Sequence, residues 1–166
     1  MKESEVFETA SLSIDIDGHH IVDDESFDQK EFLKSWRKVP IARNPPVRHR
    51  KLIWKDTTAR RKVYAVTLSA ELSGSYNSAV LGKNLYHEEY GEKDIYVFNS
   101  RSASVGETLI ALKIEECEEK NLSFHEVVRQ VEEYIEEQNT YFVLETLETL
   151  RKNGRLTGLK AIVATA

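Results

Sequence analysis

The sequence has little of several features that would narrow its class. It contains one cysteine, Cys117, among 166 residues, which excludes an intrachain disulfide framework. No stretch approaches the roughly 20 consecutive apolar residues that a membrane-spanning helix needs. The polar start, Met1-Lys-Glu-Ser-Glu5, lacks the apolar core of a secretory signal peptide. We therefore expect a cytoplasmic protein without an integral membrane segment, in which Cys117 is a small packing residue.

Motifs that mark many nucleotide-dependent, metal-dependent or hydrolytic enzymes are also missing. The sequence has neither GxxxxGK[ST] nor GxGxxG, the glycine-rich patterns that hold phosphates. Its five histidines have no spacing typical of metal ligands. No GxSxG nucleophile elbow occurs. We expect no cofactor and no metal, and keep as an alternative an acyl hydrolase or transferase that uses Ser73.

Charge is unevenly distributed along the chain. The net charge of −5 argues against a nucleic-acid-binding domain, yet residues 43–62 hold eight Lys or Arg and one Asp. We hypothesise that residues 42–62 are anomalous and arise from a shifted reading frame. A permitted codon set for residues 43–61, read out of frame, gives K-S-A-C-P-S-P-E-A-Y. The alternative is a genuine basic surface for nucleic acid or an anionic membrane.

A β-hairpin and a short helix are predicted near the start of the chain. Residues 12–22 alternate apolar and polar side chains on both sides of Asp17-Gly18, and this pair favours a tight turn because Gly supplies positive φ. Residues 28–37 then form a helix with an apolar side. That side consists of Phe27, Phe32, Leu33 and Trp36.

From Lys62 onward, strand and helix patterns alternate. The expected strands are residues 63–68, 95–98 and 141–144, and the expected helices are residues 73–90, 103–120, 123–138 and 145–152. The strand at residues 63–68 is a continuous β-prone run, which is typical of burial on both faces. This alternation implies a parallel sheet joined by crossover helices. The predicted fold class is α/β, with a parallel sheet flanked by helices and an added hairpin.

Three of these helices carry apolar residues that we expect to be buried. Ser123 and Glu126 also have the spacing of a capping box, which predicts that a helix begins there. The residues expected to be buried are Tyr76, Val80, Leu81 and Leu85 in the first helix, Val105, Leu109, Leu112 and Ile114 in the second, and Phe124, Val127, Val128, Val131, Tyr134 and Ile135 in the third.

Two hydroxyl-rich loops follow successive strands. Residues 69–75 include Ser73 and Gly74, and residues 99–106 repeat this chemistry after the next strand. In a parallel sheet both loops lie at the carboxyl edge, where a helix N-terminus favours an anion or a polar headgroup. The alternative for each loop is that its serines only cap a helix. Arg155 follows the last helix, where it either contacts an acidic ligand or interacts with terminal carbonyls.

Three motifs, in order, resemble those of the DegV family. Leu68-Ser-Ala-Glu-Leu-Ser-Gly-Ser-Tyr-Asn77 is similar to the signature S-S-x-L-S-G-T-Y. Val97-Phe-Asn-Ser-Arg-Ser-Ala-Ser-Val-Gly106 resembles a strand followed by D-S-x-x-x-S-x-G. Leu147-Glu-Thr-Leu-Arg-Lys-Asn-Gly-Arg-Leu-Thr157 resembles L-x-x-L-x-x-x-G-R-I. The resemblance covers nearly all of the chain outside residues 42–62.

The resemblance implies a fatty-acid carrier and not an enzyme. DegV proteins hold one long-chain fatty acid between an N-terminal α/β domain and a C-terminal domain, and some present its carboxylate to a bacterial fatty-acid kinase. By this resemblance Ser73 hydrogen-bonds the ligand carboxylate, Gly74 lets the backbone approach it, and Arg155 lies near the headgroup. The expected partners are a fatty acid and a kinase catalytic subunit, with no nucleic acid.

The chain also departs from the family pattern. The opening strand with its T-D-S motif and the C-terminal domain are missing, and Arg43-Asn-Pro-Pro-Val47 stands where a T-S-Q-P-S-type loop is expected. We therefore expect residues 1–166 to be an incomplete N-terminal domain, truncated at both ends. A gene fragment that neither folds nor binds stably stays as a further alternative.

Overall fold

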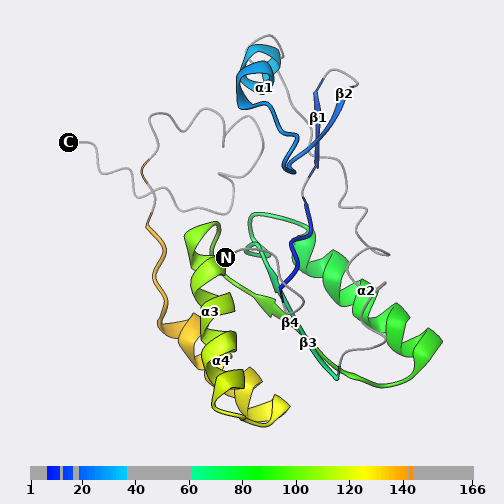
Figure 1. Cartoon of the computed structure of the whole chain (residues 1–166), viewed down its shortest axis with the longest axis vertical. Coiled ribbons are helices and arrows are strands. Elements are labelled where there is room, and N and C mark those ends of the chain that lie inside the picture. The colour runs from blue at the N-terminus through cyan, green and yellow to red at the C-terminus, as the bar shows by residue number, and fades with distance from the viewer. Residues whose placement is uncertain (1–6, 12, 17–18, 37–60, 142, 144–166) are drawn as a thin grey trace. The chain divides into compact units, whose positions relative to one another are not determined.

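The computed structural model describes residues 7–11, 13–16, 19–36, 61–141 and 143 (Figure 1). The chain divides into two compact units, residues 1–10 with 47–141 and residues 11–46 with 142–166. Residues 42–60 of the anomalous basic segment, the predicted helix at residues 145–152 and Arg155 lie outside the described residues. Among the helices that are described, none is long and apolar enough to cross a membrane.

The smaller described part consists of the predicted hairpin and helix. Strand β1 (Ser13–Ile16) pairs antiparallel with β2 (His19–Val22), and Ser13 lies opposite Val22. Helix α1 (Gln29–Trp36) begins after Asp28, whose Oδ1 accepts hydrogen bonds from the amides of the second and third residues that follow it, at 2.8 and 3.1 Å. Such a cap satisfies amide groups that have no partner within the helix. The hairpin strands and the helix are confirmed, while the turn at Asp17-Gly18 and the side chains of Leu33 and Trp36 lie outside what the structure describes.

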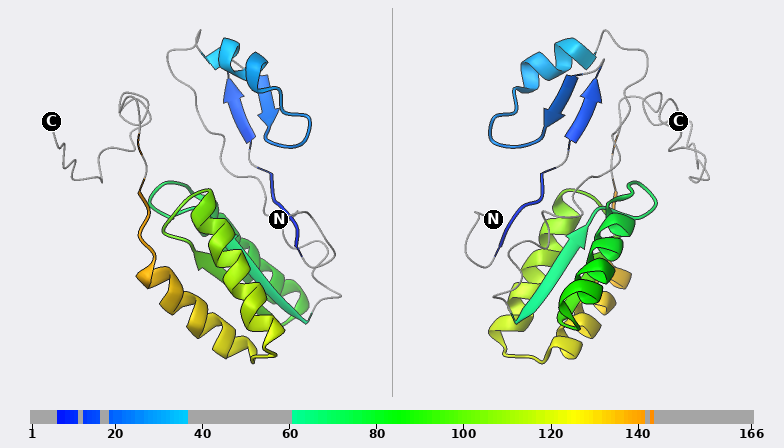
Figure 2. Two further views of the ribbon diagram at one scale, coloured as in Figure 1. Left: turned by 60° about the vertical axis from the view of Figure 1, so that its left-hand side comes forward. Right: turned by 90° about the vertical axis from the view of Figure 1, so that its right-hand side faces the viewer.

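The larger described part is a two-stranded parallel sheet with helices on both faces (Figure 2). Strand β3 (Lys62–Thr67) pairs in register with β4 (Asp94–Asn99), from Lys62 opposite Asp94 to Thr67 opposite Asn99. Helix α2 (Ser75–Tyr90) connects them, and α3 (Val105–Glu119) and α4 (Phe124–Glu137) follow. The predicted α/β class is confirmed.

Alternate side chains of the strands pack against different helices. The first core cluster joins one face of β3 and β4 to α3 and α4, and its fully buried members are Phe98, Ile110, Cys117, Val127, Val131 and Ile135. The second joins the opposite face to α2 through Ala79, Tyr86, Ile95 and Val97. This division follows from the two-residue period of a strand. Cys117 is a buried packing residue, as predicted.

Helix α4 has the predicted buried face, but α2 and α3 are turned differently. Helix α2 buries Ala79, Gly82 and Tyr86 and exposes Leu81 and Leu85. Helix α3 buries Gly106, Ile110 and Cys117, while Val105, Leu109 and Leu112 are exposed. Ala79 packs with residues of the sheet and Gly106 packs against Ser102, and a pattern based on large apolar residues misses contacts made by small ones. The prediction for these two helices was therefore wrong at Leu81, Leu85, Val105, Leu109 and Leu112.

Two strand predictions also need correction. Residues 62–66 of β3 are only half-buried, so this strand is not buried on both faces among the described residues. Tyr141 and Val143 belong to no strand and are 90% and 100% exposed. The other residues of the predicted strand at 141–144 lie outside the described part of the chain.

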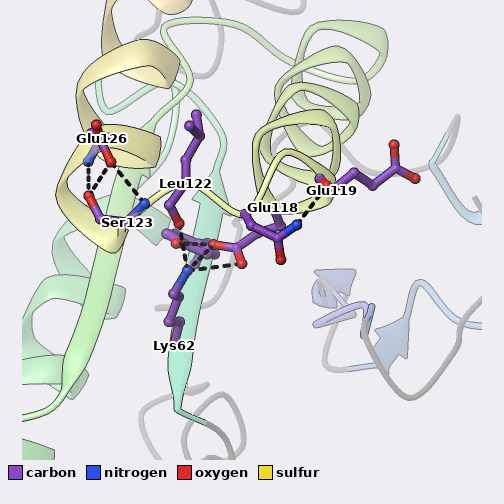
Figure 3. Close-up of polar contacts among 8 residues, drawn as sticks. Lys62, Glu118, Glu119, Leu122, Ser123 and Glu126 are labelled. Atoms are coloured by element: carbon purple, nitrogen blue, oxygen red, sulfur yellow. Dashed lines mark hydrogen bonds and ion pairs between the residues drawn. The ribbon is translucent and has the colours of Figure 1, made fainter.

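Polar contacts at the amino end of the sheet, opposite the hydroxyl-rich loops, tie β3 to the end of α3 (Figure 3). Lys62 Nζ donates to both carboxylate oxygens of Glu118, at 2.9 and 3.0 Å, and to the carbonyl of Leu122 at 3.0 Å. Tyr64 Oη donates to Glu118 Oε1 at 2.6 Å. In Figure 3 the Glu119 side chain points away from this group. We call Lys62, Tyr64, Glu118 and Leu122 the amino-end cluster.

Two half-buried tyrosines predict a loss of stability at alkaline pH. Burial and the hydrogen bond to Glu118 raise the pKa of Tyr64, and burial and a bond to Glu132 raise the pKa of Tyr96 to about 12. Unfolded tyrosines ionise near pH 10, about two units below Tyr96 in the folded protein. The stabilisation is therefore complete below about pH 10 and decreases as the pH rises toward 12.

Chemical denaturation across this range should show the free energy of unfolding falling with pH. The variant with Tyr64→Phe and Tyr96→Phe should show a shallower fall, because two of the titrating groups are gone. Equal slopes for the two proteins would show that these tyrosines do not contribute.

Candidate functional site

Two loops at the carboxyl ends of β3 and β4 are in direct contact. The first loop is residues 69–74 and the second is residues 99–104. The amide of Ser69 donates to the carbonyl of Ser102 at 2.9 Å, and the amide of Ala70 donates to Asn99 Oδ1 at 3.0 Å. The strand ends are joined by a bond of 3.2 Å from the Ser100 amide to the Thr67 carbonyl. The prediction that both loops lie at one edge of the sheet is confirmed.

The first loop is a tight turn that leads into α2. The carbonyl of Ser69 accepts hydrogen bonds from the amides of Leu72 and Ser73, at 2.9 and 3.0 Å. Gly74 is the residue before α2, and no side chain caps the helix from that position. Ser73 Oγ instead accepts a bond of 3.2 Å from the amide of Ser75. Ser73 therefore caps one amide at the start of α2. Its hydroxyl hydrogen can still be donated to another acceptor.

The residues that follow Ser73 provide open space for a ligand atom. They also provide a buried hydroxyl that has no hydrogen-bond partner among the described residues. Gly74 is exposed, and a Cβ placed on it would meet nothing within 4 Å. Its φ of −74° is ordinary for any residue, so its smallness and not its backbone freedom is the relevant property. Ser75 Oγ is buried with no hydrogen-bond partner among the described residues. These groups lie at the positive end of α2, which favours a carboxylate.

The serines of the second loop are used within the protein itself. Ser100 Oγ donates to the Ser102 carbonyl at 3.0 Å and accepts from the Ser102 amide at 3.1 Å. Ser102 Oγ accepts from Thr140 Oγ1 at 2.7 Å. The amide of Ser104 donates to Glu107 Oε2 at 3.0 Å at the start of α3. Ser104 therefore takes part in a helix cap, as the capping alternative expects, and Ser100 and Ser102 bond within the protein, so the first loop is the better candidate for a ligand.

Charged side chains near this edge include Glu71, which is exposed in the first loop, and Arg101 and Glu107, which follow β4. Burial raises the pKa of the Glu107 carboxyl, and the bond from the Ser104 amide partly offsets this. Arg101 is exposed, has a φ of 49° and lies 3.8 Å from Glu136. Among the described residues, no group of His, Cys, Asp and Glu side chains could hold a metal ion. Arg155, the predicted headgroup contact, is outside the described residues.

Sequence reasoning placed Asn99 in the loop but assigned it no role. Its Oδ1 also accepts from the amide of Arg101, two residues later, at 3.3 Å. An Asn that bonds its own backbone two residues on is a common turn device, and this was the signal available in the sequence. The bond from Ala70, which joins the two loops, had no such signal because it depends on the register of β3 and β4.

Gly106 and Gly74 provide a matched pair of glycine substitutions. A Cβ on Gly106 would lie far inside the contact distance of the buried Ser102 side chain, whereas one on Gly74 meets open space. We expect Gly106→Ala to lower the free energy of unfolding by about 1–3 kcal/mol, the usual range for overpacking. Gly74→Ala should leave it within about 0.5 kcal/mol of the original value. Thermal and chemical denaturation of both variants measures these changes. Equal losses of unfolding free energy for the two substitutions would contradict the prediction.

Comparison with known proteins identifies the relatives of this chain. The family model described as "Uncharacterised protein, DegV family" matches residues 1–166. A DegV domain-containing protein of Streptococcus pneumoniae strain R6 is 31% identical over 153 residues, which cover 92% of this chain and 54% of the relative. The chain thus spans about half the length of this curated relative.

Solved structures agree with the family match. A DegV-family protein from Ruminococcus gnavus ATCC 29149, refined with vaccenic acid, is 56% identical with a TM-score of 0.85, covering 96% of this chain and 58% of its own. The Fatty Acid Kinase (Fak) B3 protein of Streptococcus pneumoniae, loaded with linoleic acid, is 31% identical with a TM-score of 0.75, covering 89% and 52%. By its sequence motifs, its fold and a family match along its whole length, this chain belongs to the DegV family.

Proposed function

We propose that this protein binds a long-chain fatty acid and holds the carboxylate at the first loop. Ser73 donates its hydroxyl hydrogen to the carboxylate, and the open space at Gly74 lets the ligand approach the start of α2. Arg155 is a further headgroup contact in this proposal. The observation that carries it is the Ser73 side chain, which accepts from the Ser75 amide and keeps its own hydrogen for a ligand.

The two ends of a fatty acid contribute differently to binding. Each buried CH₂ contributes about 0.8 kcal/mol, so the tail supplies most of the binding free energy. A hydrogen bond to a charged group adds about 1.5–3 kcal/mol and fixes which end of the ligand lies at the loop. Support for this ligand class comes from the Ruminococcus gnavus protein, which is 56% identical and was refined with vaccenic acid.

We further propose that the protein is a carrier that presents the carboxylate to a fatty-acid kinase and does not itself catalyse a reaction. The Fak B3 protein, named for that kinase, is 31% identical to this chain. A serine hydrolase would need a general base that accepts the hydrogen of the Ser73 hydroxyl. Among the described residues, the hydrogen bond to Ser73 Oγ comes from the amide of Ser75, and no histidine or carboxylate is bonded to it.

Native mass spectrometry of the protein purified from a bacterial host tests this proposal. We expect one co-purified acyl chain per protein and no turnover of acyl esters. A protein that carries no acyl chain and takes up none when vaccenic acid is added would refute the carrier. Ester hydrolysis that disappears in Ser73→Ala would support the enzyme instead.

A further inference from the structure

Asn99 is the side chain that connects the two loops. It is the last residue of β4 and half-buried, and its Oδ1 accepts from the amide of Ala70 in the first loop at 3.0 Å. The same oxygen accepts from the amide of Arg101 in the second loop at 3.3 Å. One carbonyl oxygen has two acceptor positions, and here both are used. Asn99 thus fixes backbone on each side of the gap between the strand ends.

The contact to Ala70 is transmitted to Ser73 over a short path. Ser69, next to Ala70, provides the carbonyl that accepts from the Ser73 amide at 3.0 Å, and Ser73 Oγ in turn accepts from the amide of Ser75. The direction of the Ser69 carbonyl depends on the peptide plane that it shares with the Ala70 amide, because that peptide unit is planar. Holding the Ala70 amide therefore holds the acceptor that places Ser73.

Three other hydrogen bonds join the strand ends. The Thr67 hydroxyl donates to the carbonyl of Phe98 at 3.1 Å, within the strands themselves, and two further bonds are between backbone groups. The Ser69 amide bonds the Ser102 carbonyl, and the Ser100 amide bonds the Thr67 carbonyl. Side-chain substitution leaves these groups in place. Among the hydrogen bonds described between the two loops, Asn99 to Ala70 is the one that a substitution can remove while the sheet pairing stays.

We propose that Asn99 is a positioning residue for the carboxylate site, which orients Ser73 through the Ala70 amide. This inference rests on the proposed function. Asn99 does not touch the fatty acid; it narrows the range of positions of the Ser73 hydroxyl. Loss of its oxygen leaves the Ala70 amide without its partner and lets the turn move, so that Ser73 spends less time in the orientation that binds the carboxylate.

A double-mutant cycle on vaccenate binding separates this role from a general structural one. We expect Asn99→Ala to weaken binding about three- to tenfold, the effect of one hydrogen bond. In the Ser73→Ala variant the same substitution should change the affinity little further, because Asn99 acts on the ligand through the Ser73 hydroxyl, which is absent there. Asn84→Ala, an exposed asparagine on α2, is the matched control and should leave binding unchanged.

Hydrogen exchange of the ligand-free protein provides a second readout. The amides of Ala70 and Ser73 should exchange faster in Asn99→Ala, and Asn99→Asp should restore protection because its carboxylate oxygen accepts the same bonds. If Asn99→Ala does not fold, Asn99→Gln replaces it, because the extra methylene displaces the acceptor oxygen. The Ala70 and Ser73 amides should then exchange faster in Asn99→Gln.

The positioning role would be overturned if the Ser73→Ala and Asn99→Ala substitutions multiplied each other's effects on the dissociation constant. It would also be overturned if the Ala70 amide exchanged at an unchanged rate in Asn99→Ala. A wild-type protein that binds no vaccenate would overturn the proposed function instead, so the two failures are distinguishable.

Discussion

Replacing Ser73 with alanine is expected to weaken vaccenate binding about ten- to a hundredfold. This range corresponds to the loss of one hydrogen bond to a charged acceptor, about 1.5–3 kcal/mol. Binding should not disappear, because the acyl tail still buries its CH₂ groups. Since Ser73 Oγ also accepts from the amide of Ser75, the free energy of unfolding should fall by no more than about 1 kcal/mol. Titration with a fluorescent acyl competitor measures the affinity.

Ser123→Ala is the matched control for that experiment. Ser123 accepts from the amide of Glu126 at the start of α4, so it is a helix-capping serine far along the chain from the first loop. Its loss should cost about 1 kcal/mol of stability and leave vaccenate affinity unchanged. The two variants therefore resemble each other in stability and differ in binding. Equal affinities would contradict a direct role for the Ser73 hydroxyl.

Phe98→Ala is expected to lower the free energy of unfolding by about 3–5 kcal/mol, the cost of removing a large buried aromatic side chain. Phe98 is 0% exposed and is the largest fully buried side chain of the first core cluster. Its ring centroid is 4.7 Å from that of Tyr96 and 6.3 Å from that of Tyr64. Because domains are typically stable by only about 5–15 kcal/mol, much of the variant would be unfolded at mild denaturant concentrations.

Circular dichroism during urea denaturation measures the effect of Phe98→Ala. Leu109→Ala is the control, because Leu109 lies on α3 but is 41% exposed and outside both core clusters. It should change stability by about 0.5 kcal/mol or less. A loss below 1 kcal/mol for Phe98→Ala would mean that the core of the protein is not where the structure places it.

The elements most accurately predicted from the sequence are those whose signals are local. Asp17-Gly18 predicted the hairpin, and Ser123 with Glu126 predicted the first turn of α4, because turn and cap preferences depend on a few neighbouring residues. The buried faces of α2 and α3 were misjudged because they depend on how Ala79 packs on the sheet and on how Gly106 packs against Ser102, and tertiary structure decides both contacts.

The same distinction applies to the candidate site. Ser73 and Gly74 could be placed at the start of a helix from their order after a strand, and the structure puts them there. The link from Asn99 to Ala70 crosses between two strands, so no spacing along the chain predicts it. The proposed ligand class rests on the family relationship, since a hydroxyl and an open glycine at a helix N-terminus fit several anions.

Nuclear magnetic resonance of the ¹⁵N-labelled protein, titrated with vaccenate, tests the central claim most directly. We predict that the largest shifts among the described amides occur at residues 69–75, with smaller shifts at residues 99–102. The amides of the amino-end cluster, at the opposite end of the sheet, should change little. Shifts centred on Lys62, Glu118 and Leu122, or no shifts at millimolar ligand, would contradict the account.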